Sequence, residues 1–152
     1  MANTQSMCTS FMGELLTGTH NFTPSTGDTF KAALYLASAT INASTTAYSV
    51  SGEVSGAGYS AGGVTVTNAV APASTNSSAT AGVAYWTPSA SLTYSGVTLT
   101  TAFDAVLIYN SSKSDKAVSV HTFGSQTVTA GTFSLTMPSN TTSTALIRLA
   151  TT

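Results

Sequence analysis

Three residue types that can carry out nucleophilic catalysis occur in the chain order of some hydrolases. Gly58-Tyr59-Ser60-Ala61-Gly62 fits the motif G-x-S-x-G, and Asp104 or Asp115 and then His121 follow it. The motif works on a strand-to-helix turn that exposes the serine hydroxyl, whereas here a glycine-rich run leads into the β-branched stretch Val64-Thr65-Val66. We therefore interpret the run as a turn that needs glycine, and we expect no enzyme.

The other side chains that could hold a metal or a cofactor are few and far apart. Cys8, His20 and His121 are the thiol and imidazole groups of the chain, and they lack the close spacing that lets two ligands share one element. The five carboxylates are spread from Glu14 to Asp115 without the pairing that glycoside hydrolysis uses. We expect no metal, no cofactor and a buried, structural thiol at Cys8.

The N-terminal segment has the pattern of a short amphipathic helix. Between Gln5 and Thr17, Phe11 and Leu15 are four residues apart, which places them on one helical face, and Gly18 follows as a stop. The pattern predicts one helix ahead of the rest of the chain.

From Thr29 onward the pattern is that of β-strands. Apolar residues alternate between Phe30 and Leu36, which predicts one apolar face. The further strand candidates, separated by short turn-forming runs, are Tyr48–Val54, Val64–Val70, Thr80–Trp86, Ser91–Thr100, Ala105–Tyr109, Ala117–Phe123, Gly131–Met137 and Ala145–Leu149. This spacing predicts an all-β domain, an antiparallel β-sandwich or barrel, over residues 23–152, preceded by a helical arm over residues 1–22.

One strand candidate differs from the others in its pattern. The run Ala105–Tyr109 is apolar at every position, without alternation. Such a run is typical of a central strand that is covered on both faces. We expect the cover to come from the N-terminal helix or from a neighbouring subunit.

Charged residues are unusually scarce, at 6% of the chain with a net charge of -1, where about 25% is usual for a soluble domain. About a third of the residues are Ser or Thr, so hydroxyl groups must keep the surface hydrated. Four scattered cations form no basic stripe, and we expect no direct contact with nucleic acid. No stretch approaches the roughly 18 apolar residues of a membrane helix, and no charged segment precedes an apolar one at Met1, so we expect neither membrane binding nor secretion.

Four strings, taken in order, give the chain a likeness to a known family. They are Gly13–Phe22, Gly27–Tyr35, the loop Glu53–Gly63 and Val106–Asn110. The chain resembles a family of tailed-bacteriophage virion proteins, namely head decoration or cement proteins. The resemblance implies a jelly-roll-like β-sandwich with a short N-terminal helix or arm that engages the capsid, and it implies no catalytic residues.

The resemblance also implies partners and a location. The protein would bind the major capsid protein and itself, as a homodimer or homotrimer, on the head surface of a virion assembled in the host cytoplasm. The residues expected at the capsid or subunit interface are Phe11, Met12, Leu15, Leu16, Phe22 and Tyr59. The alternative is a module of the phage tail or fibre, in which an aromatic loop residue such as Tyr59 contacts a receptor or saccharide.

Overall fold

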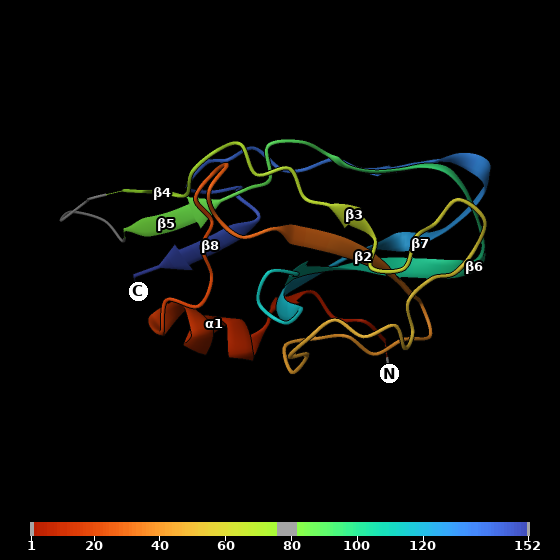
Figure 1. Ribbon diagram of the computed structural model, residues 1–152, viewed down its shortest axis with the longest axis horizontal. Helices are drawn as coiled ribbons and strands as arrows, with labels where there is room; N and C mark the ends of the chain where they lie inside the picture. Colours follow the sequence, from red (N-terminus) through yellow and green to blue (C-terminus); the bar gives the residue numbers. More distant parts are fainter. Residues whose placement is uncertain (1, 76–81, 152) are drawn as a thin grey trace.

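Within residues 2–75 and 82–151, which the computed structural model describes, the chain forms eight strands and one short helix. The elements are β1 (Ser6–Met7), α1 (Thr9–Leu16), β2 (Phe30–Leu36), β3 (Val64–Thr65), β4 (Ala73–Ser74), β5 (Val83–Trp86), β6 (Leu92–Asn110), β7 (Lys116–Leu135) and β8 (Ile147–Ala150). The strands pair antiparallel in a sheet of order β1-β7-β6-β2-β3 and a sheet of order β4-β5-β8 (Figure 1). The prediction of an all-β antiparallel sandwich with a short N-terminal helix is confirmed.

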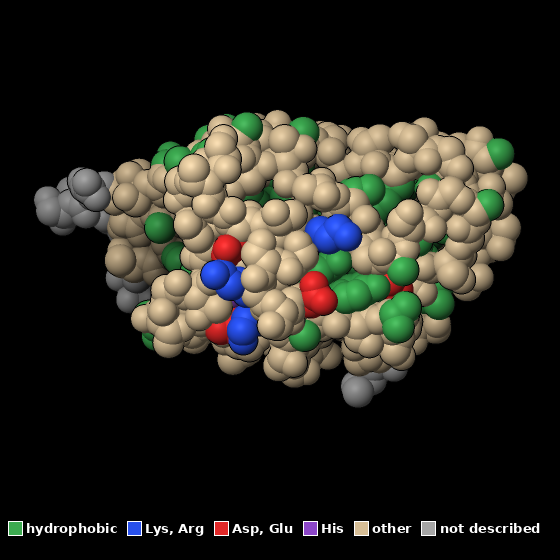
Figure 2. All heavy atoms as spheres, viewed as in Figure 1, with side chains coloured by type: hydrophobic (Ala, Val, Ile, Leu, Met, Phe, Trp, Pro, Cys, Tyr) green, Lys and Arg blue, Asp and Glu red, His purple; other side chains and the backbone are tan. Residues whose placement is uncertain are grey.

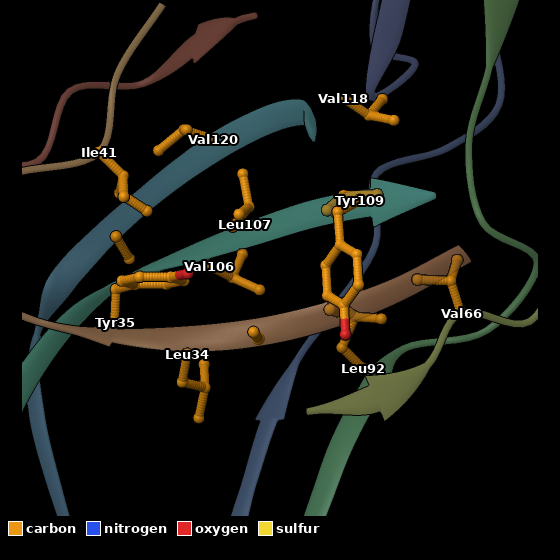
Figure 3. Packing of buried hydrophobic residues seen from close by; sticks show 14 of the residues in the cluster. Leu34, Tyr35, Ile41, Val66, Leu92, Val106, Leu107, Tyr109, Val118 and Val120 are labelled. Carbon is orange, nitrogen blue, oxygen red and sulfur yellow. The ribbon is translucent and has the colours of Figure 1, made fainter. Parts of the chain in front are cut away.

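The centre of the larger sheet is β6, and its run Ala105–Tyr109 is buried on both faces, as predicted. The neighbouring strand β2 was expected to bury one face only, but Ala33 and Tyr35 are buried as well as Leu34. Figure 3 shows the reason, because Tyr35 and Ile41 lie on one side of β2 and Leu34 on the other. The core therefore extends over both faces of the sheet.

The hairpin of β6 and β7 is longer than predicted, because each strand joins two segments that we expected to be separate strands. Its register shifts at several points, which lets the two strands bend without ending. Figure 1 shows that both strands of the hairpin bend at one end of the molecule and run back over the sheet. Consistent with this, the Tyr94 hydroxyl donates to the Ala32 carbonyl of β2 at 2.8 Å, and the rings of Phe103 and Phe133 meet edge to face at 5.0 Å.

Three other strand predictions differ clearly from the structure. Of the expected strand Val64–Val70, only Val64–Thr65 forms a strand, β3. The expected strand Tyr48–Val54 is a turn, closed by the Glu53 amide donating to the Val50 carbonyl at 3.2 Å, and Glu53 forms a single bridge with Tyr35. The expected strand Thr80–Trp86 is observed as β5 from Val83, and residues 80 and 81 lie outside the described residues.

The N-terminal segment, expected as an arm over residues 1–22, packs into the same core as the sandwich in the structure. Strand β1 pairs with β7, and the Cys8 amide donates to the Val118 carbonyl at 3.0 Å. The buried Asn3 side chain donates to the Leu36 carbonyl at 3.0 Å and accepts from the Ile41 amide at 3.1 Å. Phe11 of α1 is 0% exposed, so this side chain anchors the helix to the core.

The surface is formed mainly by uncharged side chains and backbone. Figure 2 shows the charged side chains of one face gathered in a small area, with the remainder of that face tan or green. Among the described residues, two ion pairs join Lys and carboxylate groups, Lys113 with Asp28 at 3.6 Å and Lys116 with Glu14 at 2.6 Å. Both ion pairs thus involve a lysine at the tip of the long hairpin.

Candidate functional site

An apolar groove lies between α1 and the smaller sheet. It encloses about 160 Å³, and none of its lining side chains is charged. Its walls are formed by residues from the helix, from the segment after it and from the smaller sheet, namely Phe11, Leu15, Phe22, Pro72, Ala84, Tyr85, Trp86, Ile147 and Leu149. A concave, apolar site of this kind takes an apolar group more readily than an ion or a polar substrate.

The helix wall of the groove follows from the spacing of the apolar residues in α1. Phe11 and Leu15 are one turn apart, so Phe11 anchors the helix in the core while the half-buried Leu15 faces the groove. On the rest of the helix, Met12 is 45% exposed and Leu16 is 90% exposed. Two large apolar side chains are therefore open to solvent on the helix that forms one wall of the groove.

The floor of the groove is an aromatic cluster held in place by one amide. Phe22 stacks on Phe30 with ring centres 4.3 Å apart and meets Trp86 edge-on at 4.8 Å. The Asn68 side chain accepts from the Trp86 indole N–H at 3.0 Å and donates to the Phe22 carbonyl at 2.8 Å. This amide links two segments that are distant in sequence, so the floor is fixed before any partner binds.

A polar network fixes the position of α1 from the opposite side. Glu14 bonds to Lys116 at 2.6 Å and to the buried His20 at 2.7 Å. The Asn110 amide oxygen accepts from the Ser112 N–H, so its nitrogen faces Nδ1 of His20 at 2.9 Å. Nδ1 is therefore the acceptor, and Nε2–H donates to Glu14. The helix is thus tied to the tip of the β6–β7 hairpin through His20.

The two carboxylates of this network have lowered pKa values. Burial alone would raise the pKa of Glu14, but hydrogen bonds from Lys116 and His20 outweigh it. Burial likewise opposes the shift at Asp28, whose pKa is lowered by hydrogen bonds from the Asn110 side chain and the Asn21 amide. Both carboxylates therefore remain charged at neutral pH, and Glu14 holds α1 to Lys116 and His20.

Tyr59, the sixth expected interface residue, lies away from the groove in a cluster around Glu53. The Glu53 carboxylate is 7% exposed and accepts from the Tyr48 hydroxyl at 2.6 Å, the Tyr59 hydroxyl at 2.7 Å and the Gly62 amide at 2.8 Å. The Tyr59 hydroxyl also accepts from the Leu34 amide at 3.0 Å. Tyr59 therefore holds its own loop against β2, and its hydroxyl is occupied within the domain.

The same cluster raises the pKa values of several tyrosines. Burial is the largest cause, and the Glu53 carboxylate adds to it. The pKa rises to about 12 for Tyr35 and Tyr109, and it is raised further for Tyr48, Tyr59 and Tyr94.

Alkaline pH should destabilise the fold through these tyrosines. A phenol with a raised folded pKa keeps its proton where the unfolded chain loses it, so its stabilising effect is complete below about pH 10 and is lost as the pH rises through about 12. We expect the midpoint of urea denaturation to fall steeply over this interval. The decline should be less steep in Tyr35→Phe, and an unchanged slope there would contradict the assignment.

The residues of the serine motif do not meet. The His121 imidazole bonds to the Ser119 hydroxyl at 2.9 Å, and Asp104 accepts from the Asn3 amide at 2.6 Å. Ser60 and His121 line two different hollows. Burial lowers the pKa of His121 to about 4. The glycines of the motif have a conformational role, since Gly58 has a φ of +77° and a Cβ there would collide with the Gly96 carbonyl.

The thiol and metal predictions can be compared with the same structure. Cys8 is fully buried, as predicted, and burial raises its pKa to about 11, with a smaller effect from Glu14. In the part of the chain that the structure describes, no three His, Cys, Asp or Glu side chains gather into a group that could hold a metal ion. No helix of the described residues is long and apolar enough to cross a membrane.

Of the six expected interface residues, the structure brings Phe11, Leu15 and Phe22 into the groove and leaves Met12 and Leu16 exposed on the same helix as Phe11 and Leu15. Sequence reasoning missed the opposite wall, from β5 and β8. Ile147 and Leu149 alternate in β8, which is a signal for a shared face, but nothing local to β8 indicates that this face meets a helix from the N-terminus. Comparison with protein-family models, with curated proteins and with solved structures finds no match to this chain.

Proposed function

We propose that the protein is a bacteriophage head decoration protein that binds the major capsid protein and stabilises the shell. The observation that carries the proposal is the uncharged groove beside α1, together with the exposed side chains of Met12 and Leu16 on the same helix. A preformed apolar groove on an element that also exposes large apolar side chains is typical of a protein-binding site. The resemblance of the chain to phage decoration proteins supplies the identity of the partner, and a jelly-roll class for the sandwich is part of the proposal.

The chemistry of the groove selects the kind of segment that it binds. An apolar side chain from an uncharged segment of the capsid protein would enter between Leu15 and Leu149, while Leu16 packs on the surface around it. A charged group would lose its hydration there without gaining a partner. The fixed positions of α1 and Trp86 lower the ordering cost of binding, because few groups have to be immobilised.

The low charge of the surface also supports an assembly role. Decoration proteins occupy a shell in many copies at close quarters, where a high net charge would repel neighbouring copies. A net charge of -1 avoids this repulsion, and the abundant Ser and Thr side chains keep the protein hydrated. The two properties suit a protein that is packed densely on one surface.

A charge placed in the groove should abolish binding to the capsid. Leu149 is 40% exposed at the groove, so Leu149→Asp leaves the core intact but places a carboxylate where the partner would bury it. We expect the affinity for heads lacking the protein to fall about a hundredfold, measured by co-sedimentation. Val50→Asp is the matched control, since Val50 is 68% exposed and lies outside the groove. Equal binding by both variants would refute the groove as the docking site.

Copy number separates the head from the tail. A decoration protein should be present at on the order of hundreds of copies per particle and should remain on tailless heads, as its symmetry requires. A tail or fibre module would be present at about tens of copies or fewer and would be lost with the tail. A quantitative gel of purified tailless heads decides between them.

A further inference from the structure

One edge of the larger sheet is left open by the pairing of its strands. Strand β7 pairs with β6 along its length, whereas β1 covers its other edge only at Ser119 and Val120. From His121 to Leu135, no strand within residues 2–75 and 82–151 pairs with that edge. A row of backbone N–H and C=O groups therefore lies along the open side of β7.

This edge lacks two of the usual protections against pairing with another chain, namely charged side chains and proline. Exposed edges are commonly blocked by charged side chains, especially Lys, or by Pro. Residues 121–135 contain no Lys, Arg, Asp, Glu or Pro, and their outward side chains are mainly hydroxyls, such as those of Thr127, Thr129, Thr132 and Ser134. Register shifts against β6 bend β7 along much of its length, and one of them lies between the pairs Val97–Gly131 and Tyr94–Phe133. Phe133–Leu135 then pairs with Leu92–Tyr94 in unbroken register.

We propose that a second copy of this chain pairs antiparallel with the open edge of β7, centred on the segment Gly131–Leu135, to form a two-fold dimer. Pairing across a two-fold axis places each edge opposite the same edge of its partner. A charged edge would oppose its own charge in that arrangement, whereas this edge carries none. Thr and Ser side chains on facing strands can also exchange hydrogen bonds.

The proposal goes beyond capsid binding and selects among oligomeric states. When the open edge of β7 pairs with the same edge of a second copy, the contact closes after two subunits, because both of these edges are then used. The structure therefore favours a dimer over the trimer that the resemblance also allowed. The groove beside α1 is lined by residues outside β7, so the dimer contact and the capsid contact use different residues.

Two neighbouring positions offer a matched test. Thr93 in β6 and Ser134 in β7 are opposite each other, both are exposed, and their hydroxyls lie 3.2 Å apart. Lysine at either position removes the same contact and adds the same charge, but only Ser134 lies on the strand with the open edge. The experiment compares full-length wild type, Ser134→Lys and Thr93→Lys by sedimentation velocity over a concentration series.

We expect the wild type to sediment as a dimer. In Ser134→Lys the dissociation constant should rise about tenfold or more, because two like charges approach across the axis, while Thr93→Lys should stay close to wild type. Hydrogen exchange should show backbone amides of residues 126–135 protected in the dimer and released in Ser134→Lys, with unchanged protection in β2. Equal circular dichroism and thermal midpoints of the two variants show that folding is not the cause.

Three results would overturn the proposal. The first is that the wild type sediments as a monomer at its highest soluble concentration. The second is that it sediments as a trimer. The third is that Ser134→Lys leaves the dimer intact while Leu149→Asp dissociates it. These sedimentation experiments contain no capsids, so a failure of dimerisation is distinguishable from a failure of the groove to bind heads.

Discussion

Replacing Phe11 with alanine should lower the free energy of unfolding by about 3–5 kcal/mol, a large part of the stability of a domain of this size. The Phe11 ring is fully buried and contacts the His20 ring at 4.9 Å and the Phe22 ring at 6.0 Å. Its removal leaves a cavity between α1 and the sheet and frees the helix. Urea denaturation followed by circular dichroism measures the change.

Leu16→Ala is the control for this experiment, because Leu16 lies on the same helix and is 90% exposed. Its effect should stay within about 0.5 kcal/mol. If the two variants unfolded at the same midpoint, the helix would be an independent arm, as expected from the sequence. For the same reason, deleting the residues before Phe22 should destabilise the whole domain, since it also removes β1 from β7.

Replacing Glu53 with alanine should cost about 3–5 kcal/mol, because it leaves the donors of Tyr59, Tyr48 and Gly62 without their acceptor, at about 1–3 kcal/mol for each one that stays buried. The Tyr48 ring is partly exposed, so its hydroxyl can bond to water instead. Tyr59 and Gly62 have less access to solvent. Thermal and urea denaturation at neutral pH measure the loss.

Tyr48→Phe is the matched control, because it removes one of the three hydrogen bonds and leaves the carboxylate with two donors. Its cost should be about 1 kcal/mol. Glu53→Gln should lie between the two variants, since an amide oxygen accepts from one side while the amide nitrogen meets further donors. A cost for Glu53→Ala no greater than that of Tyr48→Phe would show that Glu53 does not organise this cluster.

The strands with the strongest hydrophobic pattern could be predicted from the sequence, and their lengths could not. The run Ala105–Tyr109 was recognised as a central strand, because a strand covered on both faces needs apolar residues at every position. Its continuation through residues 101–104 was missed, since Thr101 and Asp104 in that stretch resemble a turn. The strand continues there because shifts in register against β7 absorb the bend.

The helix side of the groove was predictable, and the sheet side was not. Phe11 and Leu15 share a helical face by their spacing alone, and this placed both among the expected interface residues. The sequence cannot show how such a face divides between the domain's own core and a partner. The burial of Phe11 depends on His20, Phe22 and the sheet beneath it, which become neighbours only through long-range pairing.

The polar cluster around Glu53 was missed because its members are individually ordinary. Tyr48, Tyr59 and Gly62 each lie within ten residues of Glu53, but a carboxylate near tyrosines in sequence is usually an exposed charge. The turn that replaces the expected strand Tyr48–Val54 directs the carboxylate inward. A wrong strand prediction therefore concealed a buried charge.

The bent hairpin of β6 and β7 also bears on how the chain folds. Asn110 pairs with Lys116 and Tyr109 with Ala117, so the tip closes a loop of few residues at small entropic cost. Each further pair is then added next to one already formed, up to Leu92 opposite Leu135. The same two strands form the centre of the larger sheet and run back over it, so this sheet depends on the hairpin. We therefore expect the hairpin to form outward from its tip, where contacts local in sequence lead to pairs between distant residues.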